Sequence, residues 1–115
     1  EANRDNFIRQ MDKFSDRVKR CRTCADMEEA FQSNRTAAFL SVENGSALAG
    51  DLDRVRLLAE DGVKAITLTW NGENEIGSGH VSEHGLTDFG KKLIPELEKY
   101  NILADVSHLN DAGFR

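Results

Sequence analysis

A carboxylate and an imidazole that each follow a predicted strand are the side chains of this sequence best placed to do chemistry. Glu43 comes directly after the apolar run 37–42, and His108 follows a second such run at 102–106. Carboxylate oxygen and imidazole nitrogen are both ligands of zinc-like ions, but a closed or catalytic zinc site takes at least three protein ligands. The alternative reading is that Glu43 is only a solvated residue at a strand end.

The cysteines and the remaining histidines carry weaker signals. Cys21 and Cys24 have the CxxC spacing of zinc sites and redox pairs, but the sequence holds no second pair. We therefore expect free thiols, with a redox or zinc-ribbon module as the alternative. His80 and His84 repeat no ligand spacing, so we expect solvated loop residues there.

Composition excludes several classes of partner. The chain has 115 residues and a formal net charge of −5, which argues against a nucleic-acid partner. Its apolar runs are far shorter than the roughly 20 residues of a membrane-spanning helix. We expect a soluble protein without a transmembrane segment, and the compartment stays open with the cytoplasm favoured.

Local patterns predict the elements that position these residues. Apolar steps of three and four predict a helix over 6–21, and a capping box at Thr23 and Asp26 predicts a second helix that buries Met27 and Phe31. Pro95 predicts a kink or break within its helix. The full set comprises helices at 6–21, 24–32, 52–60 and 88–100, strands at 37–42, 63–69 and 102–106, a long loop at 70–86, and a further helix starting near Asn110.

Strands that alternate with helices predict an α/β fold with a parallel sheet, because such strands cannot be hairpin neighbours. The carboxyl ends of parallel strands meet at one edge of a sheet, where ligands commonly bind. Three strand ends would then bring together Glu43, Trp70 with Asn71, and His108.

Three motifs in register give the sequence a family resemblance. LSVENGSAL, GVKAITLTWNGEN and GLTDFGKKLIPELEKYNILADVSHLND resemble segments of the membrane (renal) dipeptidases, zinc metallopeptidases with an amidohydrolase-like (β/α)8 TIM barrel. Such a barrel takes about 250 residues. The resemblance therefore implies that residues 1–115 are a single segment of the barrel domain, with about three strand-helix units and with the N- and C-terminal parts absent.

The resemblance also implies roles for individual residues. Glu43 stands where a family glutamate bridges two metal ions, which implies two zinc ions, and His108 stands at a metal-site position. Trp70 replaces a histidine that contacts the substrate in some members, so Trp70 and Asn71 are expected to line the pocket of a small dipeptide substrate. The first motif reads Glu-Asn-Gly-Ser where Glu-Gly-Gly-His is common. No catalytic residue beyond the metal ligands is identified.

Two functions remain open at this point. In the first, the parent protein is a metal-dependent dipeptidase, and the 115-residue chain alone is inactive for lack of further ligands. In the second, the chain is a truncated, inactive barrel fragment that serves as an association or structural module. Exposed barrel edges would favour pairing with another copy, and hence a homo-oligomer.

Overall fold

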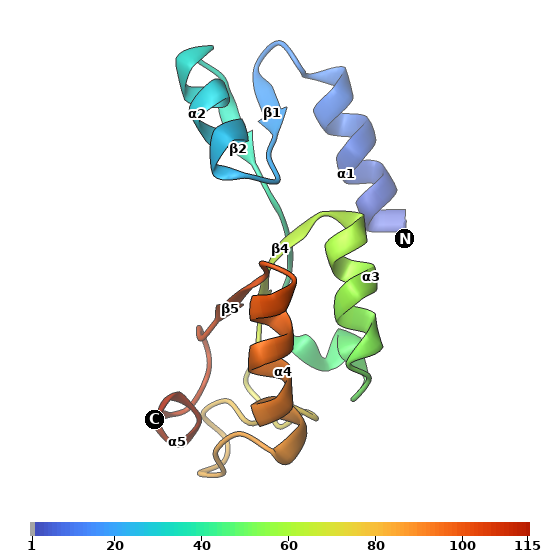
Figure 1. Cartoon of the computed structure of the whole chain (residues 1–115). Coiled ribbons are helices and arrows are strands. Elements are labelled where there is room, and N and C mark those ends of the chain that lie inside the picture. Colours follow the sequence, from blue (N-terminus) through green and yellow to red (C-terminus); the bar gives the residue numbers. More distant parts are fainter. Residues whose placement is uncertain (1) are drawn as a thin grey trace. The chain divides into compact units, whose positions relative to one another are not determined.

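The computed structural model describes residues 2–115, and its contacts divide the chain into two compact units, Glu1–Leu40 and Ser41–Arg115. Both units contain short parallel strands connected through helices (Figure 1). A parallel pair requires a crossover connection, which the helices supply. The predicted α/β class with parallel strands is confirmed.

The first unit is a pair of parallel strands with two helices. Val18 pairs with Thr36 and Arg20 with Ala38, and α2 packs on both strands. Its elements are α1 (Ala2–Lys13), β1 (Val18–Arg20), α2 (Cys24–Gln32) and β2 (Thr36–Ala38).

The helix predicted over 6–21 is wrong in its second half. The helix ends at Lys13, and turns that include the bond from the Val18 N–H to the Phe14 carbonyl (2.9 Å) lead into β1. The apolar steps continue through this region, but residues 18–20 form backbone hydrogen bonds with β2 instead of continuing the helix. That partner lies 18 residues further along the chain, where no local period can reveal it.

The second helix begins as predicted but buries a different residue. Thr23 and Asp26 form the reciprocal capping box. Met27 and Phe31, predicted to be buried, are exposed, with Phe31 at 86%. The fully buried residue is Ala30, whose small side chain allows α2 to approach the strand pair closely.

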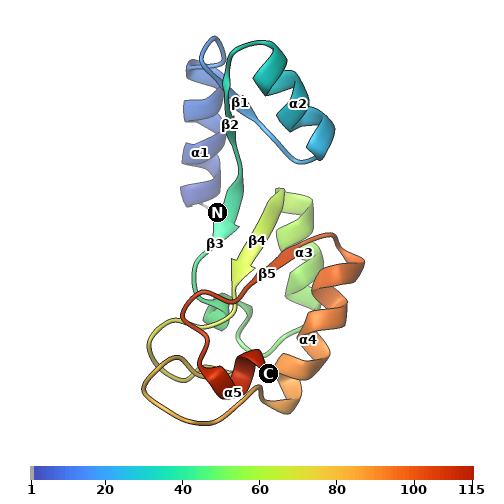
Figure 2. The ribbon, with the colours of Figure 1, turned by 90° about the vertical axis from the view of Figure 1, so that its left-hand side faces the viewer.

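The second unit contains a three-stranded sheet in the order β3-β4-β5. Strands β4 and β5 are parallel, and the arrows of β3 and β4 point the same way in Figure 2. The elements are β3 (Leu40–Val42), a 3-10 turn η1 (Gly45–Leu48), α3 (Asp53–Asp61), β4 (Val63–Thr67), α4 (Asp88–Lys99), β5 (Leu103–Asp105) and α5 (Asp111–Phe114).

The strand predicted over 37–42 is two strands. Residues 36–38 form β2 and pair with β1, whereas residues 40–42 form β3 and pair with β4. Phe39 separates them and is 41% exposed. The apolar run looks continuous in the sequence because both halves are extended, although they serve different sheets.

Helix α4 runs through Pro95 without the expected break. Proline leaves the carbonyl four residues earlier without its helical donor. Both Pro95 and Lys91 lie on the exposed side of α4, so water can bond to that carbonyl, while buried Leu93 and Leu97 hold the helix to the core. Thr87 caps the helix start and Asn101 takes the left-handed conformation at its end, both as predicted.

The core of the second unit includes Ile76 from the middle of the long loop. Ile76 lies in the loop between β4 and α4, yet it is fully buried. This anchor ties the loop to the sheet. The buried cluster consists of Leu48, Val55, Ile66, Leu68, Ile76, Leu93, Leu97 and Ile102. Within residues 2–115, no helix is both long and apolar enough to cross a membrane.

Candidate functional site

Glu43 follows β3 directly and its side chain is exposed. The next residue, Asn44, has a left-handed backbone with φ 71°. Its Oδ1 accepts hydrogen bonds from the Ser46 N–H (3.1 Å) and from Asn74 Nδ2 (2.9 Å). We call residues 43–46 the Glu43 turn. It is held by a side-chain amide from a loop 30 residues further along the chain.

His108 lies in a turn that follows β5. Its backbone is also left-handed, with φ 68°, and its side chain is exposed. The imidazole lies beside the indole of Trp70, with ring centroids 6.4 Å apart and planes tilted by 52°. The ends of β4 and β5 thus bring Trp70 and His108 together, and Trp70 stays 50% exposed on its other sides.

Asn71 is half-buried, and its backbone lies in close contact with a later part of the loop. Its carbonyl accepts a hydrogen bond from the Val81 N–H (3.4 Å). A Cβ on Gly79 would come within 1.9 Å of the Trp70 carbonyl oxygen, so the loop crosses over Trp70 and Asn71 without room for a side chain. The backbone at Gly79 therefore packs directly against the backbone of the two predicted pocket residues.

Asp105 organises the turn that carries His108, which the sequence analysis missed. Its carboxylate accepts hydrogen bonds from the Thr67 hydroxyl (2.8 Å) and the Ser107 N–H (2.9 Å). The Ser107 backbone, the Ser107 side chain and Thr67, in that order, hold the pKa of Asp105 below its ordinary value. We call residues 105–108 the His108 turn. The Asp-x-Ser spacing is the one local signal that could have indicated it.

The other candidates are the two cysteines and the remaining two histidines. Cys21 is buried and Cys24 is exposed, and both are free thiols, as predicted. His80 and His84 are exposed loop residues, and the His84 carbonyl accepts a hydrogen bond from Asn110 Nδ2 (2.8 Å).

The donor set is chemically suited to a metal but short of a full set. Glu43 offers carboxylate oxygens and His108 offers imidazole nitrogens, the groups that zinc binds. Among residues 2–115, no group of three or more His, Cys, Asp or Glu side chains could hold a metal ion. The described residues therefore contain no complete site of three or more such ligands.

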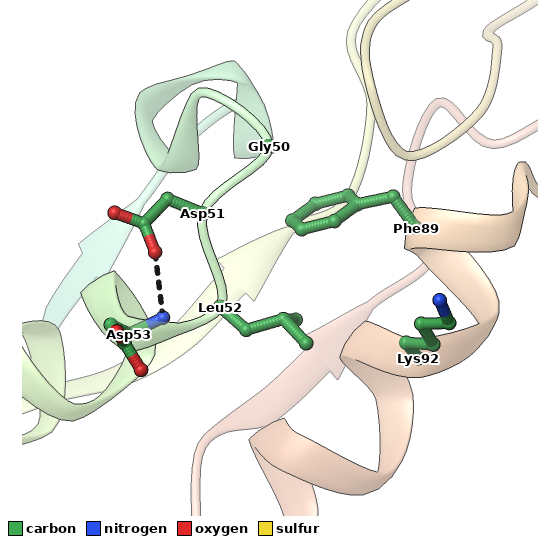
Figure 3. A pocket seen from close by; sticks show the side chains of 6 residues that line it. All are labelled: Gly50, Asp51, Leu52, Asp53, Phe89 and Lys92. Atoms are coloured by element: carbon green, nitrogen blue, oxygen red, sulfur yellow. Dashed lines mark hydrogen bonds between the residues drawn. The ribbon is translucent and has the colours of Figure 1, made fainter.

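A hollow on the helix side of the sheet offers an alternative location for a ligand (Figure 3). Phe89 and Leu52 face each other across it. The Asp51 carboxylate accepts a hydrogen bond from the Asp53 N–H (2.9 Å). Its lining comprises Gly50, Asp51, Leu52, Asp53, Phe89 and Lys92. It contains neither Glu43 nor His108, so it is separate from the strand-end residues.

Solved structures define the class of protein. An amidohydrolase from Pseudomonas aeruginosa superposes with a TM-score of 0.93 at 24% identity and covers 98% of this chain and 35% of that chain, which shows the fold. A dipeptidase of metallopeptidase family M19 superposes with a TM-score of 0.90 at 26% identity, over 98% of this chain and 36% of that chain. The chain is thus a partial segment of an amidohydrolase-type α/β barrel.

Sequence comparison gives the family. The family model "Membrane dipeptidase (Peptidase family M19)" matches residues 2–115, so the chain belongs to this family of metallodipeptidases. A metallopeptidase from Rhodobacter sphaeroides, liganded with a phosphinate mimic of the dipeptide L-Ala-D-Ala, has a TM-score of 0.85 and 27% identity over 96% of this chain and 34% of that chain. An uncharacterized protein in the PQQ-III 3' region of Acinetobacter calcoaceticus is 26% identical over 95% of this chain and 37% of its own length.

Proposed function

We propose that the ends of β3, β4 and β5 form part of the metal and substrate site of a zinc-dependent dipeptidase. The observation that carries this proposal is the placement of Glu43 and His108, two zinc-ligand types, after strands of one sheet in a chain of the M19 family. The chain spans about a third of the length of the relatives it matches, with 37%, 36% and 34% covered. The activity is therefore proposed for a protein in which this segment is joined to the rest of the barrel.

Glu43 and His108 would each bind metal through an exposed side chain. The Glu43 carboxylate would be a ligand shared by two ions, and the His108 imidazole would bind one of them. The other ring nitrogen of His108 needs a hydrogen-bond acceptor to fix its orientation. Bound zinc lowers the pKa of a metal-bound water and polarises a carbonyl.

Trp70 and Asn71 would form one wall of the substrate pocket. Half of the indole surface is exposed beside His108, so an apolar dipeptide side chain can pack against it. The dipeptide mimic bound by the Rhodobacter sphaeroides metallopeptidase supports a small dipeptide as the substrate class.

The second candidate is an inactive module that associates through its edge. Strand β5 lies at the edge of the three-stranded sheet, and Leu103 on it is 72% exposed. Edge strands with exposed apolar side chains promote pairing with another chain. A homo-oligomer would then form by pairing of β5 with another copy of the chain.

Metal content and turnover separate the two candidates. We expect the 115-residue chain to bind zinc weakly and to lack appreciable dipeptidase activity, whereas the chain extended at both ends to the length of its relatives binds zinc and hydrolyses dipeptides. Tight stoichiometric zinc binding by the 115-residue chain would contradict the proposed ligand set. An extended chain that folds without metal or activity would favour the module.

A further inference from the structure

The carboxamide of Asn74 uses its full hydrogen-bonding capacity. An asparagine side chain has two N–H donors and two acceptor lone pairs. Here Nδ2 donates to Asn44 Oδ1 (2.9 Å) and to the Leu68 carbonyl (2.9 Å), while Oδ1 accepts from the N–H groups of Ile76 (2.8 Å) and Gly77 (3.1 Å). One side chain therefore joins the Glu43 turn, the end of β4 and the long loop.

The backbone conformation beside Glu43 depends on this junction. Asn44 has φ 71°, a region that residues other than glycine occupy only with local support. The support comes from Asn44 Oδ1, which is bonded on one side to the Ser46 N–H and on the other to Asn74. Without the second bond, Asn44 Oδ1 keeps only its hydrogen bond with the Ser46 N–H.

The adjacent glycine shows how closely the turn fits against the loop. A Cβ on Gly45 would lie 2.2 Å from Ile76 Cδ1 and 2.9 Å from the Leu68 carbonyl oxygen. Asn74 bonds to both of these neighbours, through the Ile76 N–H and the Leu68 carbonyl. Hydrogen bonds from Asn74 and packing of Gly45 thus involve the same two residues, Leu68 and Ile76.

We propose that Asn74 is a positioning residue for Glu43, acting through Asn44. It would act without binding metal or substrate itself, because its bond to Asn44 fixes the direction in which Glu43 leaves the sheet. The inference rests on the proposed role of Glu43 as a metal ligand. Residues that orient a metal ligand typically change metal affinity or activity by about 10- to 100-fold when they are replaced.

Two aspartate substitutions test the inference with the same change of charge. Asn74→Asp removes both donors but can still accept from the Ile76 and Gly77 N–H groups, so the loop keeps its turn while the bond to Asn44 is lost. The control Asn101→Asp makes the same substitution at an exposed residue with a positive φ after α4, outside the Glu43 turn. A negative charge attracts cations, so the added charge alone would not lower zinc affinity in either variant.

Amide exchange in the metal-free 115-residue chain reports the turn itself. In Asn74→Asp we expect faster exchange of the Ser46 amide and unchanged protection of the Ile76 amide, which also verifies folding. In the unchanged chain, the Asn74 side-chain N–H signals should exchange slowly. Rapid exchange of these signals would overturn the inference without any variant.

Zinc affinity and kcat/KM in the extended chain report the functional consequence. We expect both to fall by about 10- to 100-fold in Asn74→Asp and to stay close to the unchanged protein in the control Asn101→Asp. The core variant Ile102→Val serves as a control for a general loss of stability. Equal values in the two aspartate variants, with the unchanged protein active, would overturn the positioning role alone. An unchanged protein without metal or activity would overturn the proposed function and this role with it.

Discussion

The Glu43 turn and the His108 turn hold similar backbone conformations by different kinds of hydrogen bond. Both present a proposed metal ligand just beyond a strand, and both place a non-glycine residue in the left-handed region, Asn44 at φ 71° and His108 at φ 68°. The first is held by neutral amide groups from Asn74, and the second by the ionised carboxylate of Asp105.

The two turns also differ in burial. Gly45 in the Glu43 turn is buried and meets the core residue Ile76, whereas Ser107 and His108 are exposed. Packing therefore contributes to the first turn and little to the second. The His108 turn depends more on charge-assisted hydrogen bonds, which are stronger than neutral ones but depend on pH.

Acid should affect the two turns unequally. Because the folded-state pKa of Asp105 is lowered, its stabilising contribution is fully present above the unfolded pKa near 4 and is lost as pH falls through the lower folded value. The amide bridge of the Glu43 turn has no proton to gain in this range. We therefore expect acid to weaken the His108 turn more than the Glu43 turn.

The largest expected effect is on activity, from Glu43→Gln in the extended chain. The substitution keeps the size but removes the charge that would bridge two cations, so turnover of a simple dipeptide should fall by orders of magnitude and zinc content should drop. The melting temperature of the metal-free protein should change little, because the side chain is exposed. Retained metal with near-normal turnover would remove Glu43 from the site.

The packing half of the comparison is tested by Gly45→Ala. The added Cβ meets Ile76 and a backbone carbonyl, so we expect a loss of about 1–3 kcal/mol in the free energy of unfolding, measured by urea denaturation. Gly72→Ala is the control, since its Cβ would have nothing within 4 Å. Equal losses in the two variants would mean that the Glu43 turn is not tightly packed.

The charge half is tested by Thr67→Val, which removes one donor to Asp105. We expect a loss of about 1 kcal/mol at neutral pH, and a smaller loss in acid once pH has fallen through the lowered pKa of Asp105 and its carboxyl is protonated. The matched control is Thr69→Val in the same segment. The Thr69 hydroxyl is buried and has no hydrogen-bond partner within residues 2–115, so its removal should be neutral or stabilising. A loss at Thr67 that does not depend on pH would contradict the role of the Asp105 charge.

The smallest effect is expected from Ser107→Ala. The Ser107 backbone N–H, which contributes most to lowering the pKa of Asp105, is retained in this variant. The free energy of unfolding should therefore change by less than about 0.5 kcal/mol, as is usual for exposed sites. A loss as large as that of Thr67→Val would show that the Ser107 hydroxyl contributes substantially to the stability of the His108 turn.

The sequence by itself determined the features that depend on neighbouring residues. The capping box at Thr23, the cap at Thr87 and the left-handed Asn101 all occur as predicted. The strand that begins at Val63 is also found as predicted, and Glu43 and His108 each follow a strand. Each of these signals acts over a few residues, within reach of a side chain and its own backbone.

Only the tertiary structure decided the pairings between distant segments. It converted residues 18–20 from predicted helix to strand, divided the run 37–42 between two sheets and exposed Phe31. It also set the two side chains that hold the turns, since Asn74 meets Asn44 across 30 residues and Asp105 meets Thr67 across 38. A hydrogen bond between segments so far apart depends on strand order and register, and these are fixed by burial and pairing across the whole unit, which local sequence patterns do not encode.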